Sequence, residues 1–166
     1  MKKLLLVLVL AAIITTGTAF ADYPGGLGIG IQGGGAYGWA GGLDYGAALS
    51  LKIPSLPIFW TIQANFGGGE FGLNVAGDVY LIHNPLVDSA NLDWYLGLGI
   101  GAGIWGFSDT LGLGASGRVP IGLSWQPLDL LELYLQVVPQ LGVSVLPKFR
   151  FPYGGMGANV GLRLWF

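Results

Sequence analysis

The chain has 166 residues, of which 52% are hydrophobic and 10% are charged, and its formal net charge is −2. Soluble domains usually have about 25% charged residues, so this composition leaves little polar surface for a domain in water. The acidic balance argues against nucleic acid as a partner, because that binding depends on clustered positive charge. The chain has no cysteine, so disulfides play no part in its stability.

The first 21 residues have the three parts of a secretory signal peptide. Met1-Lys2-Lys3 is a short basic start, residues 4–14 are uninterrupted apolar residues, and Ala19-Phe20-Ala21 has the small residues of a cleavage site. A helix that spans a bilayer needs roughly 20 apolar residues, so this run is too short for a membrane anchor. We therefore expect residues 1–21 to be a cleaved signal and residues 22–166 to be one barrel domain.

Beyond the signal, apolar residues alternate with small or polar residues, which is the two-residue period of a β-strand. The alternation defines eight segments, residues 27–32, 43–53, 60–66, 73–81, 92–102, 113–125, 133–143 and 156–166. No later stretch is long enough for a transmembrane helix, and only helices and closed barrels satisfy every backbone group inside lipid. The sequence therefore predicts an all-β fold, an eight-stranded antiparallel transmembrane β-barrel in up-and-down order. We expect it in the outer membrane with periplasmic termini.

The two faces of these segments differ in chemistry. One face is mostly Leu, Ile, Val, Ala and Trp, and the other is Gly, Ser, Asn, Gln and scattered charges. A transmembrane barrel turns its apolar face to lipid, whereas a soluble ligand-carrying barrel would turn that face inward. A soluble barrel or sandwich is the weaker alternative, since no Gly-x-Trp pattern of the lipocalin kind occurs near the first segment. Aromatic residues gather near the segment ends, as in membrane girdles; Trp60 and Trp125 lie at one end, and Phe66 and Phe107 at the other.

Two prolines interrupt the pattern. Pro120 and Pro139 lie inside predicted strands, where proline cannot donate to the ladder and a closed barrel offers no free edge. Both lie at similar distances from the turn at residues 126–132, so we expect them to face each other. We predict a shared bulge or a locally broken ladder at this point.

The predicted inward face has several charges. A barrel of eight strands has room only for side chains inside, and buried charges must be paired. We expect Arg118 and Arg163 to be the centres of a packed polar network, with Asp44, Asp78 and Glu132 as candidate partners. Glutamines and asparagines accompany them at positions 32, 63, 65, 74, 136, 140 and 159. A narrow gated or proton-conducting path is the alternative to this packed interior.

The sequence gives little support for catalysis or metal binding. His83 is the single histidine, and we place it in a periplasmic turn at residues 82–85. A lipid A deacylase of barrel type would need a His and a Ser on one lipid-facing strand near the outer rim, with a carboxylate to orient the His. One histidine and no cysteine leave only carboxylates for a metal. We expect no catalytic, metal-binding or cofactor-binding residues and no cofactor.

The predicted outer loops are short and aromatic. Tyr37 and Trp39 in the first loop, and Lys148 and Arg150 in the last loop at residues 146–155, are the candidate extracellular contacts. The two cations could contact lipopolysaccharide phosphates or a host ligand. An anchor at the membrane interface is the simpler interpretation.

The strand pattern resembles the OmpA transmembrane-domain, OmpX and OmpW class of small outer-membrane barrels. Residues 118–127 (RVPIGLSWQP), followed by residues 132–139 (ELYLQVVP), look like a family of small spirochaete-type barrels. The resemblance implies a barrel embedded in the membrane and carries over no catalytic residue. Phe166 has the lipid-facing parity of the last segment, and it resembles the terminal aromatic residue that the barrel-assembly machinery recognises.

These observations predict a non-enzymatic outer-membrane barrel that supports envelope integrity. Its expected partners are outer-membrane lipids and, during biogenesis, the barrel-assembly machinery. One alternative is an adhesin or ligand-binding barrel whose outer loops bind a host or envelope ligand. The other is a lipid-modifying enzyme of the outer membrane.

Overall fold

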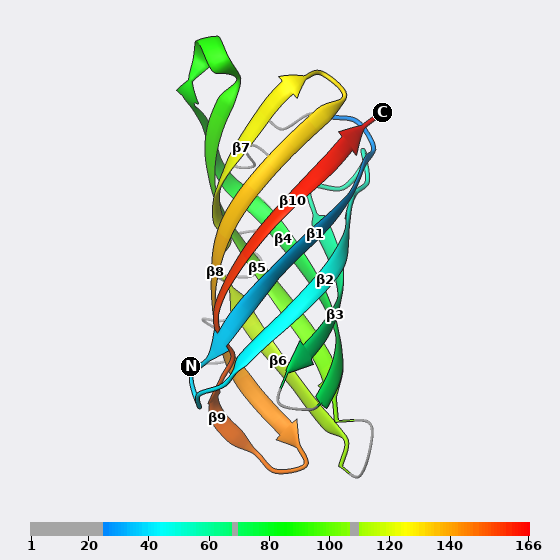
Figure 1. The fold of residues 1–166 in the computed structure, drawn as a ribbon, viewed down its shortest axis with the longest axis vertical. Coiled ribbons are helices and arrows are strands. Elements are labelled where there is room, and N and C mark those ends of the chain that lie inside the picture. Colours follow the sequence, from blue (N-terminus) through cyan, green and yellow to red (C-terminus); the bar gives the residue numbers. More distant parts are fainter. Residues whose placement is uncertain (1–24, 68–69, 107–109) are drawn as a thin grey trace, which may run out of the picture.

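The computed structural model describes residues 25–67, 70–106 and 110–166, which form one closed antiparallel β-barrel (Figure 1). The expected signal peptide and Phe107 lie outside the described residues. The elements are β1 (Gly28–Gly38), β2 (Leu43–Lys52), β3 (Phe59–Gly67), β4 (Glu70–Val87), the short 3-10 turn η1 (Asp88–Ala90), β5 (Leu92–Trp105), β6 (Gly112–Arg118), β7 (Ile121–Leu128), β8 (Leu131–Leu146), β9 (Arg150–Tyr153) and β10 (Gly155–Trp165).

The ring closes because the first strand pairs with the last, from Gly28 opposite Trp165 to Gly38 opposite Gly155. From β1 to β6 each strand pairs with its neighbour in chain order, and β8 pairs with β6, β7 and β10. β6 and β7 together occupy one strand position of the ring, since each pairs with β5 on one side and with β8 on the other. β9 pairs only with β8 and stays outside the ring. The predicted eight-stranded up-and-down barrel is confirmed.

The interruption between β6 and β7 comes from the two prolines. The Val119 N–H donates to the Pro139 carbonyl at 3.0 Å, and the Gly97 N–H donates to the Pro120 carbonyl at 2.8 Å. The strands on both sides keep the same register past this point. Each proline therefore loses only the bond that its missing N–H would make. Of the two predicted outcomes, the structure has the broken ladder and not the bulge.

The β4–β5 hairpin is longer than the sequence pattern predicts. β4 continues to Val87, and its register against β5 shifts twice, between Tyr80 and Ile82 and between Pro85 and Val87. The turn follows at η1 and ends at Asn91, whose backbone is left-handed with φ 49°. The predicted turn at residues 82–85 is therefore wrong. The bulge between Tyr80 and Ile82 breaks the alternation of inward and outward residues, so the sequence pattern ends there although the strand continues. Figure 1 shows this hairpin extending past the neighbouring strand ends on the side of the C-terminus.

The two faces of the sheet are as predicted. Ile31, Leu49 and Val160 point outward and are 56%, 59% and 62% exposed, whereas neighbouring inward side chains such as Gln32 and Ser50 are buried. This polarity is the reverse of a soluble barrel and matches a barrel surrounded by lipid. Among the described residues, no helix is both long enough and apolar enough to cross a bilayer.

Glycine makes room inside this narrow barrel. The Tyr134 ring lies over Gly161 and the Tyr95 ring lies over Gly122; a Cβ at either glycine would come within 2.5 Å of ring atoms. Eight strands cannot accommodate a large side chain at every inward position. The inward face therefore pairs a large side chain on one strand with a glycine on the next.

Candidate functional site

A buried ion pair lies in the half of the barrel that includes the C-terminus, which is the predicted periplasmic side; we call the opposite end the outer end. Arg163 of β10 and Glu132 of β8 are opposite each other in the sheet, and Arg163 Nη1 lies 2.6 Å from Glu132 Oε2. Glu132 also accepts hydrogen bonds from Trp165 Nε1 and Ser124 Oγ, each at 2.9 Å. Arg163 Nη2 donates to Ser50 Oγ at 3.0 Å. Because each charged group has further hydrogen-bond partners, the pair meets the condition for stable burial.

Aromatic rings enclose the Arg163 guanidinium. Its central carbon lies 4.7 Å from the centroid of Phe59, 4.8 Å from Tyr134 and 5.5 Å from Trp165. These distances are within the range of cation–π attraction. The Tyr134 hydroxyl in turn donates to Gln32 Oε1 at 2.9 Å. The rings therefore hold the charge from several sides and fill the space around it.

A stack of three rings extends this layer across the barrel. Phe59 stacks on Tyr80 with centroids 4.2 Å apart, and Tyr80 stacks on Tyr95 at 4.4 Å. The Tyr95 hydroxyl donates to Gln136 Oε1 at 3.0 Å. These residues come from β3, β4, β5 and β8, so the layer joins strands on different sides of the ring. We call this layer the periplasmic plug. It consists of Gln32, Ser50, Phe59, Tyr80, Tyr95, Ser124, Glu132, Tyr134, Gln136, Arg163 and Trp165.

A second ion pair lies on the outer side of the plug. Arg118 Nε lies 2.9 Å from Asp78 Oδ1, and both side chains are buried. Asp78 is two residues outward from Tyr80 on β4, and its carboxylate packs directly over Gly99. The structure thus places the predicted charged residues in two separate pairs, Arg118 with Asp78 and Arg163 with Glu132.

Asp44 joins neither pair, so its predicted place in the network is wrong. It has the inward parity of β2, but it is exposed and lies at the outer end of that strand. Six residues separate it from Ser50, which is about 20 Å at roughly 3.3 Å per strand residue. Alternation predicts the face of a residue but not its height in the barrel, and this height separates Asp44 from both arginines.

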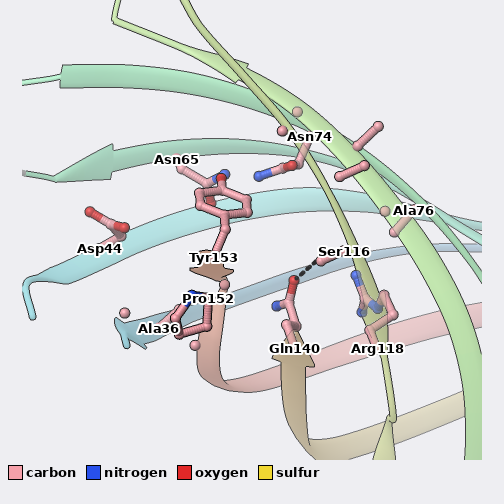
Figure 2. A pocket seen from close by; sticks show the side chains of 18 of the residues that line it. Ala36, Asp44, Asn65, Asn74, Ala76, Ser116, Arg118, Gln140, Pro152 and Tyr153 are labelled. Carbon is pink, nitrogen blue, oxygen red and sulfur yellow. Dashed lines mark hydrogen bonds between the residues drawn. The ribbon is translucent and has the colours of Figure 1, made fainter. Parts of the chain in front are cut away.

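The outer half of the barrel contains a cavity of about 230 Å³ (Figure 2). Its polar lining comes from amide and hydroxyl side chains on four strands, namely Gln63, Asn65, Asn74, Ser116 and Gln140. Gln63 Nε2 donates to Asn65 Oδ1 at 2.6 Å, and Ser116 Oγ donates to Gln140 Oε1 at 3.4 Å. Arg118 forms the inner end, and residues at the outer strand ends form the mouth. We call this space the outer cavity.

The short strand β9 forms one side of the mouth. Its Tyr153 stacks on Trp105 with ring centroids 5.1 Å apart, and the ring edge lies against Gly114. Burial raises the pKa of the Tyr153 hydroxyl, and the negative charge of Asp44 raises it further. The hydroxyl therefore remains protonated and available as a donor. Asp44 and Arg150 complete the charged part of the mouth.

The four predicted extracellular contacts all lie exposed at this outer end. Trp39 Nε1 donates to the Gln140 carbonyl at 2.6 Å, which ties the first outer loop to β8. Tyr37 is 59% exposed, and Lys148 is also exposed. Of the four, only Arg150 lines the outer cavity. Any role of these residues in binding stays a prediction.

His83 lies in a different place from the predicted turn. Its Nε2 is 3.2 Å from Asp93 Oδ2, and it pairs with Tyr95 in the β4–β5 ladder. Since the Tyr95 ring is inside the barrel, His83 lies on the inward side of the β4–β5 hairpin. The sequence did not indicate this pair because the bulge in β4 changes the parity of His83.

Neither protein-family models nor curated protein sequences match this chain. Among solved structures it is similar to Neisserial surface protein A, with 11% identity, a TM-score of 0.49, and coverage of 84% of this chain and 96% of that chain. It is also similar to the N-terminal β-barrel domain of Pseudomonas aeruginosa OprF (14%, 0.49, 84% and 97%) and to the outer membrane enzyme PagL (12%, 0.49, 82% and 99%). At these identities no function is carried over to this chain.

The closed ring and its outward apolar face define the class, a small eight-stranded transmembrane β-barrel. The narrower resemblance to spirochaete-type barrels stays a prediction, since no family model matches.

Proposed function

We propose that this protein is a non-enzymatic integral outer-membrane barrel that contributes to envelope integrity and does not conduct. The periplasmic plug carries the proposal. Arg163 and Glu132 are almost completely buried, and they hold one another at the centre of a layer of rings. An ion could pass only by separating a buried pair, which costs several kcal/mol.

The outer surface supports residence in a bilayer. Outward side chains along the strands are large and apolar, among them Ile62, Ile100 and Leu141 with exposures of 54%, 75% and 55%. A monomeric soluble protein seldom exposes a continuous apolar surface of this kind. Lipid is the partner that satisfies it, and the ring formed by the described strands closes on itself, as a barrel within the hydrocarbon must.

The position of His83 supports a non-enzymatic role. A deacylase acting on lipid would need its histidine on the lipid-facing side near the outer rim, close to a serine. His83 instead lies on the inward side of the β4–β5 hairpin, paired with Asp93 at the periplasmic end. Lipid A mass spectra from a deletion strain that differ from those of the parent would contradict this part of the proposal.

Two measurements test the proposal. Planar bilayers containing the purified full chain should show no conductance steps above the background of the empty bilayer. A deletion strain should become more sensitive to detergents and to large antibiotics, and the wild-type gene should restore resistance. Regular conductance steps, or a deletion strain that is as resistant as its parent, would contradict it.

A second candidate function is ligand binding by the β8–β9 hairpin. Phe149 and Phe151 are 72% and 63% exposed there, beside the cations Lys148 and Arg150. Aromatic residues and arginine are enriched in protein binding surfaces. Replacement of residues 147–152 by a Gly-Ser loop should abolish adhesion or ligand binding while leaving the barrel folded. Unchanged binding would remove this candidate.

A further inference from the structure

We propose that the outer cavity is a binding site for a small, neutral, polyhydroxylated molecule, of the size of one sugar residue, that enters from outside the cell. This inference goes beyond the envelope role, and it can fail while that role holds. It rests on the size, the charge balance and the hydrogen-bonding groups of the cavity.

The size of the outer cavity limits the ligand. Its volume of about 230 Å³ is more than ten times the roughly 10–15 Å³ that a single water requires, so the space can hold a small organic molecule. A single sugar ring is of this order, whereas a nucleotide or an acyl chain is larger. Among the described residues, the Arg118–Asp78 pair forms the floor, and below it the plug fills the barrel.

The charges around the cavity balance. Arg118 at the floor is paired with Asp78 behind it, and Asp44 at the mouth has the opposite charge to Arg150. An anion would meet the Asp44 carboxylate on its way in, and a cation would meet the Arg150 guanidinium. Neither sign is favoured overall, so a neutral molecule fits this lining best.

The hydrogen-bonding groups suit hydroxyls. Side-chain amides both donate and accept, as a sugar hydroxyl does. Asn74, Gln140 and Ser116 face the cavity from three strands (Figure 2), and each remains partly exposed inside the barrel. They are therefore accessible to a molecule in the cavity. The Tyr153 hydroxyl adds a donor at the mouth, on a ring held by its stack with Trp105.

Direct binding to the full chain in detergent micelles tests this assignment. The probes are methyl α-glucoside as the neutral polyol, inorganic phosphate as the anion and tetramethylammonium as the cation, followed by ligand-observed NMR. We expect weak, saturable binding of the glucoside alone, as befits a small ligand. The sugar could be the end of a surface glycan or a free molecule. A parallel titration with sugar-terminated lipopolysaccharide distinguishes these two sources. Competition with the glucoside indicates a surface glycan, and no competition indicates a free sugar.

Two variants localise the binding. Ala36→Leu adds bulk to the cavity wall, and Ala158→Leu, the matched control, adds the same bulk on the lipid-facing side of the adjoining strand β10. Ala36→Leu should weaken glucoside binding by about tenfold or more, and Ala158→Leu should leave it unchanged. Asn74→Leu keeps the approximate shape but removes the amide, and it should weaken binding similarly if Ala36→Leu fails to fold. No glucoside binding, tighter binding of phosphate or tetramethylammonium, or binding that both cavity variants leave intact would overturn the proposal.

Discussion

Arg163 and Glu132 face each other across β10 and β8, with 2.6 Å between Nη1 and Oε2, and they are 2% and 0% exposed. Neither residue lies near the other in sequence, so their contact forms only when the last strand joins the sheet. The pair therefore ties the last strand to β8 inside the plug.

Removing one partner of this pair should destabilise the barrel strongly. Arg163→Ala leaves the Glu132 carboxylate buried without its cation, which costs about 3–5 kcal/mol. The urea midpoint of unfolding in detergent micelles, followed by tryptophan fluorescence, measures the change. Arg150→Ala, at an exposed position, is the control and should shift the midpoint little. Equal midpoints for Arg163→Ala and the wild type would show that the pair does not stabilise the fold.

The second pair and the exposed aspartate give a matched comparison. Asp78→Asn leaves Arg118 buried and uncompensated and should lower the free energy of unfolding by about 2–4 kcal/mol. Asp44→Asn makes the same chemical change at the mouth and should alter it by less than about 0.5 kcal/mol. The same urea titration serves for both. A larger effect at Asp44 would contradict the separation of Asp44 from the two pairs.

Glycine substitutions test the close packing of the interior. A Cβ at Gly161 would lie 2.5 Å from Tyr134 Cζ and 2.8 Å from the Ile31 carbonyl, so Gly161→Ala should cost about 1–3 kcal/mol. At Gly33 the nearest atom would be 3.8 Å away, so Gly33→Ala is the control and should be tolerated. Thermal unfolding of the two variants in the same detergent compares them. Similar melting temperatures for both would show that the ring is not held against Gly161.

Phe166 should act mainly in assembly. Its backbone exchanges two hydrogen bonds of 2.9 Å with Leu27, and its side chain is 68% exposed. Phe166→Ala keeps the backbone bonds but removes the terminal ring. We expect less protein in the outer membrane and more in the periplasm in pulse-chase fractionation, with little change in the stability of the molecules that fold. Normal insertion kinetics would contradict a role as an assembly signal.

Much of the barrel was predictable because a membrane strand must turn apolar side chains to lipid and must pair its backbone N–H and C=O groups. Alternation assigned Ser50, Gln136 and Arg163 to the inward face, and the structure buries all three. The two prolines indicated the interruption between β6 and β7, since a missing N–H is a local property of the residue.

The height of a residue in the barrel was not predictable in this way. Asp44 and Asp78 have the same parity, but strand register and tilt place one at the mouth and the other beside Arg118. The bulge near Tyr80 likewise reversed the parity of His83 without any local sequence signal. Tyr95 and Tyr134 were inward by parity, but their place in the plug depends on the glycines opposite them, which only the register identifies.

The central claim is that this chain is a closed barrel in the outer membrane. Heat-modifiable gel migration of the protein from outer-membrane fractions tests it most directly, because a closed barrel resists detergent until it is boiled. We expect the protein in that fraction, with unheated samples migrating faster than boiled ones. Protein recovered in the soluble periplasm, with the same migration before and after boiling, would contradict the claim.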